Sequence, residues 1–211
     1  MYTVFVAGAH GRTGRHIIKA LQKGNYNVRG LVRSEEQRFN LLKWGAMPYI
    51  GDLNTEFSEG IIDADAVICA VGAGDKSDPE EIDHLGTVRL IEQSELLGVK
   101  RFILISSMGT LEPERMPKIL KPYLSAKRRA EKVLEASTLC HTILRPGGLT
   151  DELPTGKVSV HQEFTDLGFI PRSDLAQAAV LALTLSETEN TSFNLVAGDT
   201  PIAQALQSLE G

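Results

Sequence analysis

Short apolar runs alternate with longer segments of helical periodicity along the first two thirds of the chain. A compact apolar run predicts a buried strand, and apolar positions three and four residues apart predict an amphipathic helix. Strands that alternate with helices predict an α/β fold, a Rossmann-like doubly wound parallel sheet with helices on both faces. The predicted strands are 2–7, 28–33, 47–51, 66–71, 101–105 and 140–144, and the predicted helices are 15–23, 35–44, 79–97 and 122–136.

The alternation breaks after about Arg145, where loop-rich stretches surround a short predicted strand at 157–161. A predicted helix at 174–185, a strand at 193–196 and a helix at 201–209 complete the chain. No Gly/Ser-rich or Pro-rich linker and no internal repeat divides it. We therefore expect a single domain over 1–211, in which 146–211 forms a small C-terminal elaboration.

The composition and charge of the chain argue against several classes of function. The chain has 211 residues, 42% hydrophobic and 23% charged, as in ordinary globular proteins. Its net charge of −5 argues against a nucleic-acid partner. No leader pattern and no apolar run near the ~20 residues of a membrane helix are present, so we expect a cytoplasmic protein without membrane association. Cys69 and Cys140 lie in apolar runs and are expected to be buried, reduced thiols, and no His or Cys cluster suggests a metal site.

A glycine-rich loop, GAHGRTG at 8–14, joins the first predicted strand to the first predicted helix. Glycines allow a tight turn and a close approach of a phosphate to the backbone, and the positive end of the following helix attracts that phosphate. The alternative is a glycine turn without a ligand. The predicted phosphate-binding residues are Gly8, His10, Gly11, Arg12, Thr13 and Gly14.

The end of the second predicted strand distinguishes two dinucleotides. Sites that bind NAD usually place an acid there, about 20 residues after the glycines, for the ribose 2′-hydroxyl. Arg33 occupies this place, and a guanidinium can stack on adenine and pair with a 2′-phosphate. Arg12 could reach the same phosphate. We therefore predict NADP(H) as the preferred cofactor, with NAD(H) as the alternative; the opposing interpretation is two solvated surface arginines.

Residues at the end of the fifth predicted strand and on the next helix suggest carbonyl chemistry. Ser106 and Ser107 close the strand, and Tyr123 and Lys127 lie four residues apart on the following predicted helix, hence on one face. The lysine charge would favour the ionised phenol, which makes the tyrosine a general acid or base. The serine hydroxyl would orient a substrate carbonyl. The alternative is that Tyr123 packs against the sheet and Lys127 belongs to an exposed basic run.

Together these residues resemble the short-chain dehydrogenase/reductase superfamily. Its extended and atypical branches, the NAD-dependent epimerase/dehydratase and NmrA-like groups, are the most similar; they include small bacterial proteins regarded as sugar epimerases or NAD(P)-binding oxidoreductases. The matching segments are GAHGRTG, LVRS, GDL, CAVGAG, GVKRFILISS, YLSAK, TILRPGGL, IPRSDLA and FNLVAGDTPI.

The resemblance implies a role for residues beyond those motifs. Ser107, rather than Ser106, would be the orienting serine, and Lys127 would also hold the nicotinamide ribose. The segment 146–211 would form a substrate-side lobe, and its shortness disfavours a large nucleotide-sugar substrate. The remaining implied cofactor contacts are Asp52 and Leu53 at the adenine, Ala70, Val71 and Gly72 at the adenosine ribose, and Pro146 and Gly147 at the nicotinamide.

We therefore expect an NADP(H)-dependent oxidoreductase that acts on a small carbonyl or related acceptor by hydride transfer. One alternative is an NAD(P)-dependent sugar epimerase or dehydratase that keeps its cofactor bound. Another is a non-catalytic, NADP-binding redox sensor of the NmrA type. The expected partner is a small-molecule substrate, and the chain is expected to be a monomer or a homodimer.

Overall fold

The computed structural model describes residues 1–74, 77–163 and 167–209. Within these ranges the main sheet has the strand order β11-β8-β10-β6-β5-β4-β1-β2-β3. Strands β1 to β6 and β10 run parallel, whereas β8 and β11 pair in antiparallel fashion at one edge. The Rossmann-like α/β fold predicted from the sequence is confirmed. The strands of this sheet are β1 (Tyr2–Ala7), β2 (Tyr26–Val32), β3 (Met47–Ile50), β4 (Ala66–Cys69), β5 (Arg101–Ile105), β6 (Cys140–Pro146), β8 (Lys157–His161), β10 (Thr191–Ala197) and β11 (Thr200–Pro201).

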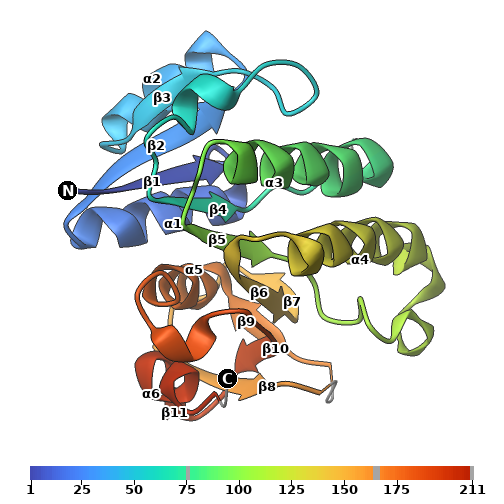
Figure 1. Ribbon diagram of the computed structural model, residues 1–211. Helices are drawn as coiled ribbons and strands as arrows, with labels where there is room; N and C mark the ends of the chain where they lie inside the picture. Colours follow the sequence, from blue (N-terminus) through green and yellow to red (C-terminus); the bar gives the residue numbers. More distant parts are fainter. Residues whose placement is uncertain (75–76, 164–166, 210–211) are drawn as a thin grey trace.

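Helices cover both faces of the sheet (Figure 1). Successive side chains of a strand point to opposite faces, so Val4 and Val6 of β1 belong to one apolar core while Phe5 and Ala7 belong to the other. Helices α1 and α5 pack together, and α3 lies beside α4. The helices are α1 (Arg12–Lys23), α2 (Glu35–Lys43), the π-helical turn η2 (Glu80–Gly86), α3 (Thr87–Leu96), α4 (Lys121–Ala136), α5 (Arg172–Leu181) and α6 (Ile202–Gln207).

The C-terminal part extends the same sheet. Strand β10 pairs with β6, and β8 and β11 follow beyond it. A separate two-stranded sheet, formed by β7 (Gly148–Thr150) and β9 (Phe169–Pro171), was not predicted, because three-residue strands are too short to show a period. Short 3-10 turns complete the described secondary structure: η1 (Ser58–Gly60), η3 (Pro113–Arg115), η4 (Lys118–Leu120) and η5 (Ser186–Thr188).

The two cysteines are free thiols, but they differ in burial. Cys69 is buried at the end of β4, as predicted. Cys140 is only partly buried, so the prediction that it is buried was wrong. This residue begins β6 at the margin of the sheet, where neighbouring elements cover it incompletely.

The strand order indicates where a ligand would bind, at the carboxyl ends of the parallel strands. It reverses between β1 and β4, and a ligand lies beyond the carboxyl ends of the strands at such a point.

Candidate dinucleotide-binding site

The loop after β1 is built around positions that accept only glycine. Gly8 has φ +78°, and a Cβ there would lie 2.5 Å from the carbonyl oxygen of Ala70. A Cβ on Gly14 would lie 2.1 Å from the carbonyl oxygen of Gly8. The Gly11 N–H donates to the same oxygen at 2.9 Å and closes the turn. The end of β1 therefore lies directly against the end of β4, and the loop has no side chain at Gly8, Gly11 or Gly14 that could block a phosphate.

The N-terminus of α1 carries no anionic side chain of its own. Gly11 is the N-cap residue and offers no side-chain hydrogen bond, and the first turn contains no acid. The first N–H groups of a helix have no partner within the helix and carry the positive end of its dipole. This N-terminus, which includes the half-buried Thr13, therefore suits a phosphate group.

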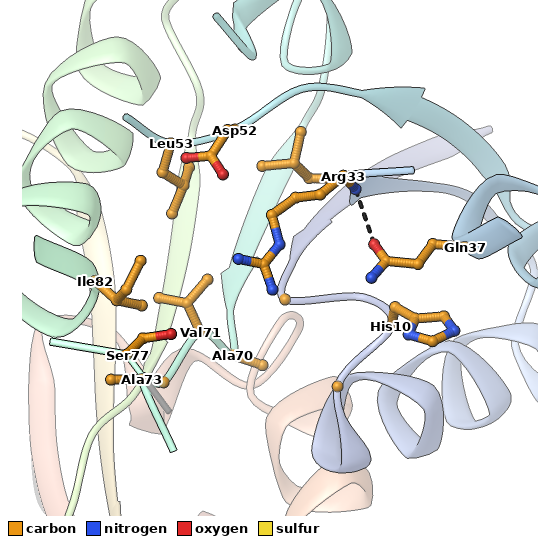
Figure 2. Close-up of a pocket in the computed structure, with 14 residues that line it drawn as sticks. His10, Arg33, Gln37, Asp52, Leu53, Ala70, Val71, Ala73, Ser77 and Ile82 are labelled. Carbon is orange, nitrogen blue, oxygen red and sulfur yellow. Dashed lines mark hydrogen bonds between the residues drawn. The ribbon is translucent and has the colours of Figure 1, made fainter. Parts of the chain in front are cut away.

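A cavity of about 240 Å³ opens beside this loop (Figure 2). Nine predicted cofactor residues line it together: Gly8, His10, Gly11, Arg33, Asp52, Leu53, Ala70, Val71 and Gly72. The sequence analysis missed five other lining residues, of which only Leu31 and Ala73 belong to matching segments: Leu31, Gln37, Ala73, Ser77 and Ile82. Of these, Gln37 had a local signal, because it lies one helical turn after Arg33.

Arg33 reaches into this cavity from the end of β2, as Figure 2 shows. Its backbone N–H donates to Gln37 Oε1 at 2.8 Å, which fixes the start of α2. Across the part of the chain that the structure describes, the Arg33 guanidinium has no hydrogen bond and no ion pair. Asp52 instead turns its Oδ1 to the backbone N–H of Asn54 at 2.8 Å. The cavity therefore contains a cation that is not neutralised by the protein.

His10 also lines this cavity. Its ring stacks on the indole of Trp44, with centroids 5.6 Å apart, and its Nε2 lies 3.2 Å from Asn40 Nδ2. Both partners come from α2 or its end. The stacked pair fixes the orientation of the imidazole next to the glycine loop, and it places the chain's single tryptophan against a residue that lines the cavity.

Arg12 does not share the cavity with Arg33. Its guanidinium lies 3.7 Å from Asp151, which also accepts a hydrogen bond from Arg172 at 2.8 Å. Asp151 follows β7, so Arg12 faces the C-terminal part of the chain. The interpretation that both arginines reach one 2′-phosphate does not fit this arrangement, because the helical position of Arg12 directs its side chain toward β7 instead.

Ser107, Tyr123 and Lys127 come from the neighbouring ends of β5 and α4. Lys127 Nζ lies 5.9 Å from the centre of the Tyr123 ring, so the predicted common face of the helix is present. The same Nζ donates to the carbonyl oxygens of Val71 at 3.0 Å and Ile105 at 3.1 Å. Ser107 follows β5, and its hydroxyl donates to the carbonyl oxygen of Met108 at 3.2 Å. Lys127 is buried, so it does not belong to an exposed basic run.

The buried Lys127 has an anionic partner that the sequence analysis did not identify. Asp83 Oδ1 lies 3.1 Å from Lys127 Nζ, and neither side chain is exposed by more than 3%. Burial by itself lowers the pKa of Lys127, but the neighbouring Tyr123 and Asp83 outweigh this effect and hold the pKa above its ordinary value. Lys127 is therefore a permanent cation at the carboxyl edge of the sheet.

A second buried ionic cluster supports the end of β5. The carboxylate of Glu131 in α4 accepts hydrogen bonds from Arg145 at 3.1 and 2.9 Å. It also accepts from Ser106 at 2.5 Å and from Thr110 at 2.9 Å. The strand end that carries Ser107 is thus tied to α4 by charge-assisted bonds. The sequence offered a weak signal only, a Glu within a helix and an Arg within a strand.

Pro146 ends β6, and Gly147 follows it. The Met108 N–H donates to the Pro146 carbonyl oxygen at 2.9 Å, and the Gly147 N–H donates to that of Leu195 at 3.0 Å. Neither residue lines the cavity beside the glycine loop. Among the described residues, no group of three or more His, Cys, Asp and Glu side chains is arranged to hold a metal ion. None of the described helices has the length and apolar character needed to cross a membrane.

Comparison with known proteins is consistent with this geometry. A family model described as NAD(P)H-binding matches residues 8–185. The chain belongs to this NAD(P)H-binding family. The predicted resemblance to the atypical, NmrA-like branch of the short-chain dehydrogenases/reductases is confirmed.

Three relatives illustrate the range of the family. The uncharacterised sugar epimerase YhfK of Bacillus subtilis is 38% identical, over 98% of this chain and 99% of its own. Sanguinarine reductase of Eschscholzia californica is 31% identical, over 92% of this chain and 88% of its own. A solved structure from Bacillus halodurans, assigned to the NAD-dependent epimerases/dehydratases, superimposes with a TM-score of 0.95 at 35% identity, over 99% of this chain and 100% of that one.

Proposed function

We propose that this protein is an NADP(H)-dependent oxidoreductase that transfers a hydride to a small carbonyl or related acceptor. The observation that carries the cofactor preference is the Arg33 guanidinium, which enters the cavity without an ionic partner among the described residues. A 2′-phosphate is the dinucleotide group whose charge and geometry match such a guanidinium. No acid takes the place that an NAD site would use for the 2′-hydroxyl.

The bare glycine loop supports a dinucleotide on this side of the sheet. The pyrophosphate would lie over Gly8 and Gly11 at the uncapped N-terminus of α1. The adenine would lie toward Asp52 and Leu53, and the adenosine ribose toward Ala70. When bound in its reduced form, the nicotinamide would supply the hydride. We assign its surroundings to Pro146 and Gly147, and Arg12 to the pyrophosphate rather than to the 2′-phosphate.

The residues at the ends of β5 and α4 would act on the acceptor. Ser107 would orient its oxygen, and Tyr123 would donate the proton that accompanies the hydride. Lys127 would fix the position of these strand ends through its bonds to Val71 and Ile105. The segment 146–211 would form the substrate-side lobe. The named reductase among the relatives supports the reductive assignment.

The cofactor assignment is tested by titration of the purified chain with NADPH and NADH. Trp44 is the single tryptophan and stacks on His10 beside the cavity, so its emission should report binding directly, with calorimetry as a second measure. We expect Arg33→Ala to weaken NADPH by about 10- to 100-fold, the scale of one lost charge-assisted contact, and to leave NADH nearly unchanged.

Arg38→Ala is the matched control. Arg38 is also exposed near the start of α2, but it is paired with Glu35 at 3.2 Å. Its removal should leave both affinities unchanged. Tighter binding of NADH by the parent protein, or equal losses in the two variants, would refute the proposed preference for NADP(H).

A sugar epimerase or dehydratase is the second candidate, because the B. subtilis and B. halodurans relatives carry those descriptions. An enzyme of that kind returns its hydride to the substrate and retains its cofactor. Mass spectrometry of the nucleotide released on denaturation separates the two. A stoichiometric, tightly retained dinucleotide favours the epimerase, and a freely exchanging one favours the reductase.

A further inference from the structure

Asp83 is a buried acid next to the proposed active site, and no motif in the sequence pointed to it. Its side chain is fully buried. One carboxylate oxygen accepts a hydrogen bond from the Ala73 N–H at 3.0 Å. The other lies 3.1 Å from Lys127 Nζ and has no further polar partner among the described residues. The pair therefore consists of two opposite charges in direct contact, removed from solvent.

The π-helical turn η2 brings Asp83 to this position. A π turn inserts an extra residue into the helical repeat and is frequently found at functional sites. On the same turn, Glu80 lies 2.8 Å from His84 Nδ1 and forms an ion pair with Arg129 of α4. Two acids of η2 thus meet two basic residues of α4, Glu80 with Arg129 and Asp83 with Lys127. Glu80 does so at the surface and Asp83 in the interior.

The ion pair between Asp83 and Lys127 changes the electrostatic field at Tyr123. Lys127 Nζ lies 5.9 Å from the centre of the Tyr123 ring, so its charge acts on the phenol. A carboxylate 3.1 Å from the ammonium converts that charge into a short dipole, whose field weakens more steeply with distance. Asp83 therefore opposes the electrostatic effect of the lysine on Tyr123.

We propose that Asp83 is a positioning residue of this site, which fixes Lys127 at the strand edge and opposes its charge beside Tyr123, the proposed proton donor. This rests on the proposed function. Reduction of a carbonyl needs a phenol: the hydride forms the new C–H bond, the carbonyl π-bond breaks, and the Tyr123 proton passes to the oxygen. A bound reduced nicotinamide would supply the hydride, and solvent would return a proton to the half-exposed Tyr123.

Other charged groups on η2, η3 and α4 are held in pairs of their own. On α4, Lys121 pairs with Glu114 of η3 at 2.5 Å, and Arg129 pairs with Glu80 of η2. His84 of η2 lies on Glu80. From β4, the buried Cys69 thiol also lies near Lys127; burial raises the pKa of this thiol and keeps it neutral. Asp83 is therefore the anion that most directly offsets Lys127.

The test is a double-substitution cycle that needs no substrate. Ionisation of Tyr123 is followed by tyrosinate absorbance, isolated from the other three tyrosines by subtraction of the matched Tyr123→Phe protein. We expect Asp83→Asn to move the Tyr123 midpoint down by about one to two pH units, because the lysine charge is then unopposed. Lys127→Met should move it up. The variant with both substitutions should stay within about 0.5 unit of the parent, because both states are neutral overall.

Glu80→Gln is the control for net charge, since it removes an acid from the same turn but at the surface; it should leave the midpoint in place. If Asp83→Asn does not fold, the comparison of Lys127→Met with the double variant still isolates the Asp83 charge. An unchanged or raised midpoint in Asp83→Asn, or coincidence of Lys127→Met with the double variant, would overturn the proposal. Since no dinucleotide is present in this titration, its failure is distinct from a failure of the cofactor assignment.

Discussion

Replacing Glu131 by glutamine should be among the most damaging conservative changes in this protein. Glu131 is fully buried and holds the Arg145 guanidinium, whose side chain is 2% exposed. Glutamine keeps the shape but turns an N–H₂ group toward that guanidinium. Removing one partner of a buried ion pair costs about 3–5 kcal/mol, because the other charge is left without compensation. Glu135 lies 3.7 Å from Arg145 and offsets part of this charge, so we expect the lower end, about 3 kcal/mol.

The loss is measurable by thermal and urea denaturation. For a domain of this size, 1 kcal/mol corresponds to about 2–4 °C in Tm, so the midpoint should fall by about 6–12 °C. Glu135→Gln is the control: its side chain is 36% exposed, and it should cost less than about 1 kcal/mol. A double variant with methionine at both 131 and 145 should recover much of the stability. A loss in Glu131→Gln no larger than that of the control would refute the reasoning.

The same carboxylate should govern the response to acid. Burial raises the pKa of Glu131, but its bonds to Arg145, Ser106 and Thr110 outweigh this and hold the pKa below its ordinary value. A depressed pKa in the folded state stabilises the protein above the unfolded-state value, about 4.3, and this contribution is lost as the pH falls below it. The unfolding free energy should therefore drop more steeply between pH 5 and 3 in the parent than in Glu131→Gln, to the order of one bound proton.

Two further substitutions probe the site. Gly8→Ala combines a left-handed backbone with a contact of 2.5 Å to Ala70, so it should cost about 2 kcal/mol or more and weaken NADPH, as measured by denaturation and calorimetry. Gly98→Ala, which has φ +71° but open space around it, should show the backbone cost alone; equal effects of the two would discount the contact. Tyr123→Phe should lower kcat for carbonyl reduction by about 10²-fold or more at unchanged NADPH affinity. Tyr49→Phe, in the edge strand β3, should leave kcat unchanged. Full turnover in Tyr123→Phe would remove this residue from the mechanism.

Much of the fold followed from local pattern. The predicted strands at 2–7, 101–105 and 157–161 match β1, β5 and β8 to the residue, since short apolar runs bounded by polar or glycine residues have few other uses. Helix α1 begins at Arg12, three residues before the predicted start, because Gly14 is helical here although glycine usually signals a break. The single predicted helix over 79–97 contains a π-helical turn, which apolar periodicity does not reveal.

The sequence by itself determined the glycine loop, the order of strands and helices, and the presence of an arginine at the end of β2, because each depends on neighbours along the chain. Only the tertiary structure decided that Arg12 turns to Asp151, that Asp83 meets Lys127 and that Glu131 meets Arg145. These partners are separated by 14 to 139 positions and belong to different elements in nearly every case. Charges pair according to distance in space and exclusion of water, and neither quantity is written in the local order of residues.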